Sequence, residues 1–84
     1  MEIYSITSEW EDTKIIMGTF SSYEKALKCV INNVDNQMIK VHLPDKYDLE
    51  YNPNLIIGIT EYWNKDGKLD GVKYHYEIEK NIIE

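Results

Sequence analysis

Arginine is missing from this chain of 84 residues, so all nine of its basic side chains are lysines, against fifteen acidic ones. The guanidinium group is the preferred reader of phosphate and guanine, because it donates two parallel hydrogen bonds. Without it, and with a net charge of −6, the chain is not expected to bind DNA or RNA directly. An acidic surface suits a protein partner with a basic surface instead, or it only keeps a small domain soluble.

Long apolar runs are missing as well. No stretch approaches the roughly 20 residues of a membrane-spanning helix, and the opening MEIYSITSEW lacks the basic and then apolar regions of a signal peptide. The single cysteine, Cys29, cannot form a disulfide within the chain, which is typical of a reducing compartment. The sequence therefore predicts a soluble cytoplasmic protein that does not enter a membrane and folds as one domain over residues 1–84.

Residue types that carry catalysis are few. His42 and His75 are the only histidines, they lie in different predicted strands, and neither has a ligand-like spacing to Cys29. A phosphate-binding glycine loop and a nucleophile elbow are both absent. We therefore expect no catalytic residue, no metal site and no cofactor, and a protein that is not an enzyme. A site built from the two histidines would depend on the fold alone.

One segment has the outline of a calcium-binding loop. Counted from Asp66, the stretch DGKLDGVKYHYE puts Asp70, Gly71 and Glu77 at three positions of an EF-hand loop. Lys68, however, would stand where an oxygen ligand belongs, and the residues that follow alternate with the period of a strand. The segment is therefore interpreted as part of a β-hairpin rather than as a metal site.

The hairpin interpretation makes a prediction about register. Asp66-Gly67 is a strong signal for a two-residue turn of type I′. Pairing outward from this turn collects the apolar residues on one face. The predicted partners are Lys65 with Lys68, Ile59 with Tyr74, Ile57 with Tyr76, and Leu55 with Ile78.

Strand and helix patterns together predict the fold. Alternating or apolar stretches indicate strands at 2–10, 14–20, 37–43, 55–63 and 72–79, with a bulge near Gly18. Residues 44–54, which contain two prolines, are interpreted as an ordered surface loop. The expected fold is a small α+β domain in the order β-β-α-β-β-β, with one helix packed across an antiparallel sheet.

The helix is expected to begin at a capping box formed by Ser21 and Glu24. Apolar residues then recur every three or four positions, which predicts one buried stripe. Cys29 lies off this stripe, so its thiol is expected to be exposed. The stripe consists of Tyr23, Ala26, Leu27, Val30, Ile31 and Val34.

Two groups of acidic residues carry aromatic side chains and are not needed to build this core. Carboxylates can steer a basic partner, while an aromatic side chain supplies the desolvated contact. The candidate partner-binding residues are Glu9, Trp10, Glu11 and Asp12 at the first hairpin tip, Asp45, Tyr47, Asp48, Glu50 and Tyr51 in the loop, and Trp63 near the last hairpin. The alternative is that the charges only solubilise these loops and that each tryptophan covers one end of a small core.

The stretch KIIMGTFSSYEKALKCV, after a short strand and an acidic tip, resembles a group of small phage and prophage proteins of unknown function. In these proteins a Gly-x-Phe/Tyr-Ser-Ser strand end leads into a helix that contains Glu and Ala. The resemblance covers residues 1–34 and carries no functional residue over. It implies a viral or mobile-element setting, with action in the host cytoplasm, where small acidic proteins often bind and block a host protein.

Two classes of function follow from these observations. The first is a non-enzymatic protein-binding module, such as an inhibitor of a host defence or nucleic-acid-handling protein. The second is an accessory structural or assembly domain that self-associates or pairs through a sheet edge. Open sheet edges would also allow a homodimer. Salt dependence separates the two classes, because binding by an acidic surface weakens with ionic strength whereas edge pairing barely changes.

Overall fold

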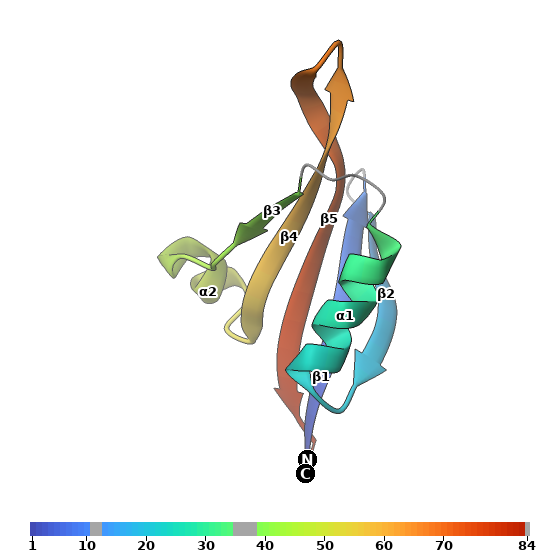
Figure 1. Cartoon of the computed structure of the whole chain (residues 1–84). Coiled ribbons are helices and arrows are strands. Elements are labelled where there is room, and N and C mark those ends of the chain that lie inside the picture. Colours follow the sequence, from blue (N-terminus) through green and yellow to red (C-terminus); the bar gives the residue numbers. More distant parts are fainter. Residues whose placement is uncertain (11–12, 35–38, 84) are drawn as a thin grey trace.

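The computed structural model describes residues 1–10, 13–34 and 39–83. Its fold is α+β with the predicted order of strands and main helix, β-β-α-β-β-β, and a short second helix lies within the predicted loop (Figure 1). The elements are β1 (Glu2–Trp10), β2 (Thr13–Phe20), α1 (Tyr23–Asn33), β3 (Ile39–His42), α2 (Lys46–Tyr51), β4 (Leu55–Lys65) and β5 (Lys68–Ile82).

The five strands form one antiparallel sheet in the order β2-β1-β5-β4-β3. The longest strand, β5, lies in the middle, and β2 and β3 are the two edges. Pairing of β1 with β5 brings residues 1 and 83 together, where Met1 and Ile83 exchange two hydrogen bonds of 2.7 Å. The far end of the β4–β5 hairpin, residues 62–72, projects beyond the rest of the sheet, and we call it the arm (Figure 1).

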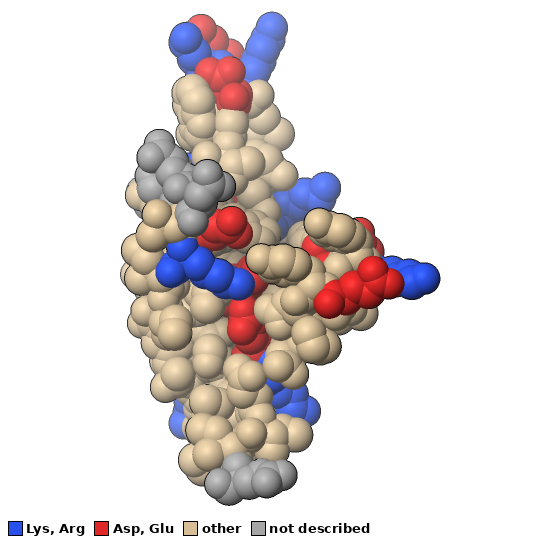
Figure 2. Space-filling model, turned by 180° about the vertical axis from the view of Figure 1, so that it is seen from behind, with Lys and Arg blue, Asp and Glu red and all other residues tan. Residues whose placement is uncertain are grey.

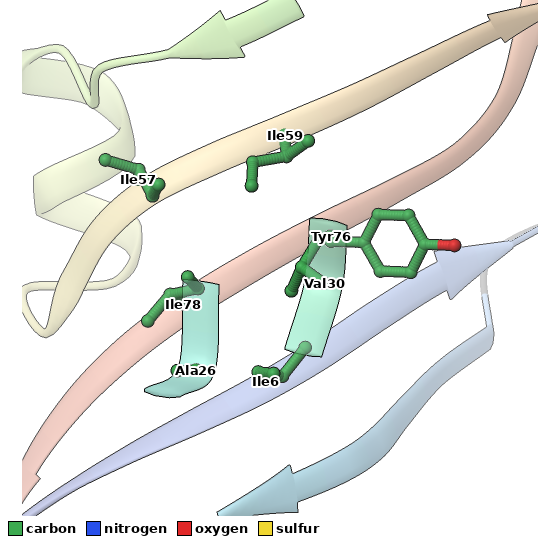
Figure 3. Packing of buried hydrophobic residues seen from close by; sticks show 7 residues of the cluster. All are labelled: Ile6, Ala26, Val30, Ile57, Ile59, Tyr76 and Ile78. Carbon is green, nitrogen blue, oxygen red and sulfur yellow. The ribbon is translucent and has the colours of Figure 1, made fainter. Parts of the chain in front are cut away.

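The core lies between α1 and the sheet. The helix packs against β1, β2 and β5, and alternation along each strand turns the apolar side chains towards it. Each fully buried isoleucine contributes on the order of 1.5–3 kcal/mol to folding. The cluster consists of Ile6, Ala26, Val30, Ile57, Ile59, Tyr76 and Ile78 (Figure 3).

Helix α1 confirms the predicted stripe in part. Ala26 and Val30 are fully buried, but Ile31 is half exposed, so its assignment to the core was wrong. The cap is Ser22, whose hydroxyl accepts a hydrogen bond from the Lys25 backbone, rather than Ser21. Cys29 is only partly exposed and packs against the core cluster, so the expectation of a freely exposed thiol was also wrong.

The last hairpin has the predicted turn and a different register. Asp66 and Gly67 both have positive φ, as a type I′ turn requires, and Lys65 pairs with Lys68. Bulges next to Glu61 and Trp63 then shift the pairing. The observed partners are Ile59 with Tyr76, Ile57 with Ile78, and Leu55 with Glu79.

A close contact between the two strands accompanies these bulges. The Trp63 indole lies across Gly71, where any Cβ would overlap its Nε1 atom. Two residues of β5, Asp70 and Lys73, have no partner position on β4, so the register moves by two. Between Ile57 and Glu61 this shift is even and leaves each side chain on its own face, which is why the predicted apolar face is kept there. A third irregularity, between Leu55 and Ile57, moves the pairing of Leu55 back by one.

Candidate functional site: an exposed helix beside a histidine–carboxylate face

The short helix α2 forms inside the stretch that the sequence pattern presented as a loop. Asp45 caps it: the Asp45 Oδ1 atom accepts a hydrogen bond from the Asp48 backbone at 2.9 Å, and Asp48 Oδ2 accepts one from the Asp45 backbone at 3.0 Å. The helix ends at Tyr51, and its C-cap, Asn52, stands just before Pro53, whose ring restricts the preceding residue to extended backbone. Paired caps and prolines therefore produce a helix of six residues.

None of the six residues of α2 is buried. Tyr47 and Tyr51 are 75% and 82% exposed, and their spacing of four residues puts them on one side of the helix. Leu49 within the helix and Leu43 before it are also exposed. We call the set formed by Leu43, Asp45, Tyr47, Leu49, Glu50 and Tyr51 the ridge.

A side-chain contact ties α2 to the sheet. His42, at the end of β3, places its Nε2 atom 3.0 Å from Asp48 Oδ2. Asp48 is thus held from two directions, and the pKa of its carboxyl is lowered, first by the hydrogen bond from the Asp45 backbone and then by His42. Among the described residues, α2 has no packing against the sheet comparable to that of α1.

The two histidines, which lie far apart in the sequence, meet on the face of the sheet opposite α1, which we call the back face. Gly58 lies between them: a Cβ there would be 3.1 Å from His42 Cδ2 and 3.1 Å from His75 Cε1. His75 Nδ1 is 3.0 Å from Thr60 Oγ1, and its Nε2 is 3.5 Å from Glu77 Oε1. A glycine at this position therefore makes room for both imidazole rings.

Carboxylates continue this polar surface along β5. Lys14 of β2 lies 3.2 Å from Glu77 and 3.3 Å from Glu79, so its side chain crosses β1 to reach them. Burial alone would lower the pKa of Lys14, but its hydrogen bonds to the two carboxylates and their charges together raise it. Figure 2 shows acidic side chains along the middle of the back face, beside the protruding α2.

The chemistry that this arrangement offers is hydrogen bonding and charge. In the described ranges, no three His, Cys, Asp or Glu side chains lie close enough together to hold a metal ion. Cys29 packs against the core beneath α1, on the other side of the sheet from the histidines. No helix in the described part of the chain is long and apolar enough to cross a bilayer.

The structure separates the predicted site residues. Asp45, Tyr47, Asp48, Glu50 and Tyr51 are together in and before α2, although Asp45 and Asp48 are engaged in capping it. The capping role of those two was not predicted from the sequence. Glu9 is exposed on β1, where it pairs with His75 of β5, and His75 in turn pairs with Thr60 of β4. Glu11, Asp12 and the Trp10 side chain lie outside the described residues.

Trp63 does not join the ridge. It lies on the arm, five residues along β4 from Gly58, which in a strand is about 17 Å. Sequence reasoning also missed Leu43 and Leu49, which the structure exposes beside the tyrosines. The Asp-x-x-Asp spacing at residues 45–48 was the available signal for α2, because a capping box places an acid three residues after the cap.

Comparison of the chain with protein-family models, with curated proteins and with solved structures found no match.

Proposed function

We propose that this protein is a non-enzymatic protein-binding module that contacts a partner with a basic surface through the ridge. The observation that carries the proposal is the exposure of Tyr47 and Tyr51 at 75% and 82% on a helix with no buried residue. Tyrosine is enriched in the energetically dominant positions of interfaces, because its rigid ring supplies a large contact area.

The charge of the ridge supports the same partner chemistry. Glu50 is exposed beside the two tyrosines, and the chain as a whole carries a net charge of −6. Carboxylates around an aromatic anchor steer a basic surface towards it and raise the association rate at low salt. The resemblance of residues 1–34 to phage proteins adds the narrower hypothesis that the partner is a host defence or nucleic-acid-handling protein in the host cytoplasm.

The test compares immobilised variants in a pull-down from cell lysate at low and high salt. The double substitution Tyr47→Ser/Tyr51→Ser removes both rings from the ridge without touching the core, and we expect it to reduce capture of a specific partner at least about tenfold. Leu69→Ser/Val72→Ser is the matched control, since both residues are exposed apolar side chains on the arm. Capture that is equal for the wild type and the tyrosine variant would refute the proposal.

A second part of the experiment tests the contribution of the negative charge of the ridge. Reversing Asp45 or Asp48 would also break the cap of α2, so the informative change is Glu50→Lys. This variant should keep the circular dichroism spectrum and weaken capture most at low salt, because the lost attraction is screened at high salt. Capture that is insensitive both to salt and to Glu50→Lys would remove the basic partner from the proposal.

A second candidate function is assembly through a sheet edge. It is favoured by a different observation, the exposed apolar residues of β2, which lies at the opposite edge of the sheet from β3 and α2.

A further inference from the structure

Glu77 and Glu79 of β5 form a carboxylate pair on the back face, and each of their side chains is only 18% exposed. One ammonium group, that of Lys14, lies 3.2 Å from Glu77 and 3.3 Å from Glu79. His75, beside Glu77, is a cation only when it is protonated. Two mostly buried carboxylates that share a single cation keep a net negative charge, so this place favours positively charged groups.

A second and independent feature of the same place is the hydroxyl of Thr7. Thr7 is 7% exposed, and its Oγ1 atom has no hydrogen-bond partner among the described residues. The preceding residue, Ile6, lies in the core, so alternation turns Thr7 to the back face, directly opposite Glu77 in the register of β1 with β5. Buried hydroxyls nearly always have a partner, so this one points to a polar ligand.

The side chain of Lys14 covers this hydroxyl. It starts on the edge strand β2 and crosses β1 to reach the two carboxylates. Glu77 is the register partner of Thr7, and Glu79 is two residues further along β5, so the lysine stem passes over Thr7. The ammonium binds both carboxylates and leaves the hydroxyl beneath it without a bond. Because the Lys14 side chain is 43% exposed, it can turn away without unpacking the core.

These acceptors suit a guanidinium group better than an ammonium. The guanidinium of arginine is flat and carries five N–H donors in a fixed fork, so it can serve two carboxylates and a neighbouring hydroxyl together. Its paired hydrogen bonds to carboxylates are also the stronger ones. This chain contains no arginine, so only a binding partner can supply such a group.

The carboxylate pair lies close to the ridge. Glu77 pairs with Gly58 of β4, and the imidazole of His42 lies against the other side of Gly58. His42 in turn contacts Asp48 of α2. Figure 2 shows the acidic side chains along the middle of this face, beside the protruding α2. A basic partner that binds the ridge is therefore within reach of the pair.

We propose that Glu77, Glu79 and Thr7 form a binding site for an arginine side chain of the partner, and that Lys14 occupies this site in the free protein. The inference deepens the proposed function and rests on it for the presence of a basic partner. Binding exchanges one cation for another, since the guanidinium displaces the Lys14 ammonium to solvent. The charge of the site stays the same, so the number and geometry of the hydrogen bonds decide the exchange.

The test titrates acetyl-arginine-amide into the whole chain and follows binding by NMR. Lys14→Met removes a tethered competitor, and we expect it to tighten binding of this probe at least about fivefold. Lys80→Met is the matched control, because Lys80 is 42% exposed and pairs at 3.0 Å with one carboxylate, that of Glu2. It should bind the probe as the wild type does. Acetyl-citrulline-amide, which has nearly the shape of arginine without its charge, should not bind.

A further variant tests the hydroxyl. Thr7→Val keeps the shape of the side chain and removes its oxygen, so in the Lys14→Met background it should weaken binding of the arginine probe. An unchanged affinity would contradict the assignment of Thr7 to the site.

Three results would overturn the proposal as a whole. These are a Lys14→Met variant that binds no more tightly than the wild type, a Lys80→Met variant that gains as much, and a citrulline probe that binds as well as the arginine probe. If Lys14→Met does not fold, the wild type decides. A high concentration of the arginine probe should then shift the NMR signals of the Lys14 side chain and the Thr7 amide, and unmoved signals would refute the exchange. The experiment contains no partner, so its failure is distinct from failure of the ridge, which Tyr47→Ser/Tyr51→Ser tests.

Discussion

Helices α1 and α2 begin in similar ways, but α1 packs into the core and α2 stays exposed. Each starts at a polar side chain that accepts a hydrogen bond from the first turn, Ser22 in α1 and Asp45 in α2. Helix α1 continues for eleven residues and buries Ala26 and Val30 against the sheet, whereas α2 ends after six and buries none. A cap is therefore enough to start a helix, but only apolar residues at helical spacing make that helix part of the core. Helix α1 stabilises the fold, and α2 is presented by it.

The largest expected difference between the two helices comes from placing the same charge in each. Val30→Asp buries a carboxylate in the core cluster, and we expect it to cost at least about 3 kcal/mol, a large share of the stability of a domain this size. Leu49→Asp puts the charge on the exposed ridge and should cost less than about 1 kcal/mol. Urea unfolding followed by circular dichroism measures both, and equal losses would contradict the comparison.

A medium effect is expected where α2 meets the sheet. Gly58→Val adds a branched side chain where even a Cβ would be 3.1 Å from both imidazoles, so the rings of His42 and His75 must give way, and the contact of His42 with Asp48 is expected to be disturbed. Overpacking of this kind costs about 1–3 kcal/mol. The control is Thr19→Val. Thr19 is exposed in β2 on the back face of the sheet, the face on which Gly58 also lies, and this change should alter the urea midpoint little. A Gly58→Val protein with an unchanged midpoint and unchanged His42 NMR signals would show that the imidazoles do not depend on this gap.

The smallest effect concerns the titration of Asp48. Because its folded pKa is lowered, Asp48 contributes stability that is present above the usual value of 3.8 and lost as the pH falls through the lowered folded pKa. NMR of the side-chain carboxyl should give a midpoint below 3.8. His42→Ala should move it part of the way back, since the hydrogen bond from the Asp45 backbone remains. A midpoint that His42→Ala leaves unchanged would mean that the contact with His42 does not favour the carboxylate.

Sequence patterns predicted the parts of this fold that depend on local periodicity. The strands, the main helix with Ala26 and Val30, and the Asp66-Gly67 turn follow from spacing and turn chemistry over a few residues. The hairpin register did not follow, because bulges beside Glu61 and Trp63 shift it, and the turn chemistry of Asp66-Gly67 carries no information about them.

The candidate site was predictable to a similar extent. Acidic and aromatic residues at 45–51 could be recognised from composition, but the role of Asp48 depends on His42, which only the fold places 3.0 Å away. In the same way, the meeting of His42 and His75 depends on the missing side chain of Gly58, in the strand between theirs. Interactions across strands are set by register, and register was the part of the prediction that bulges overturned.

Native-state hydrogen exchange tests most directly whether α1 stabilises the fold and α2 is only presented by it. The Val30 amide in α1 should exchange only through global unfolding, with a free energy equal to that from urea denaturation. The Leu49 amide, bonded to the Asp45 carbonyl at 3.0 Å, should exchange through local opening of α2, at least tenfold faster and with little response to low urea. Equal protection of the two amides, with the same urea dependence, would show that α2 is part of the cooperative core and would contradict this account.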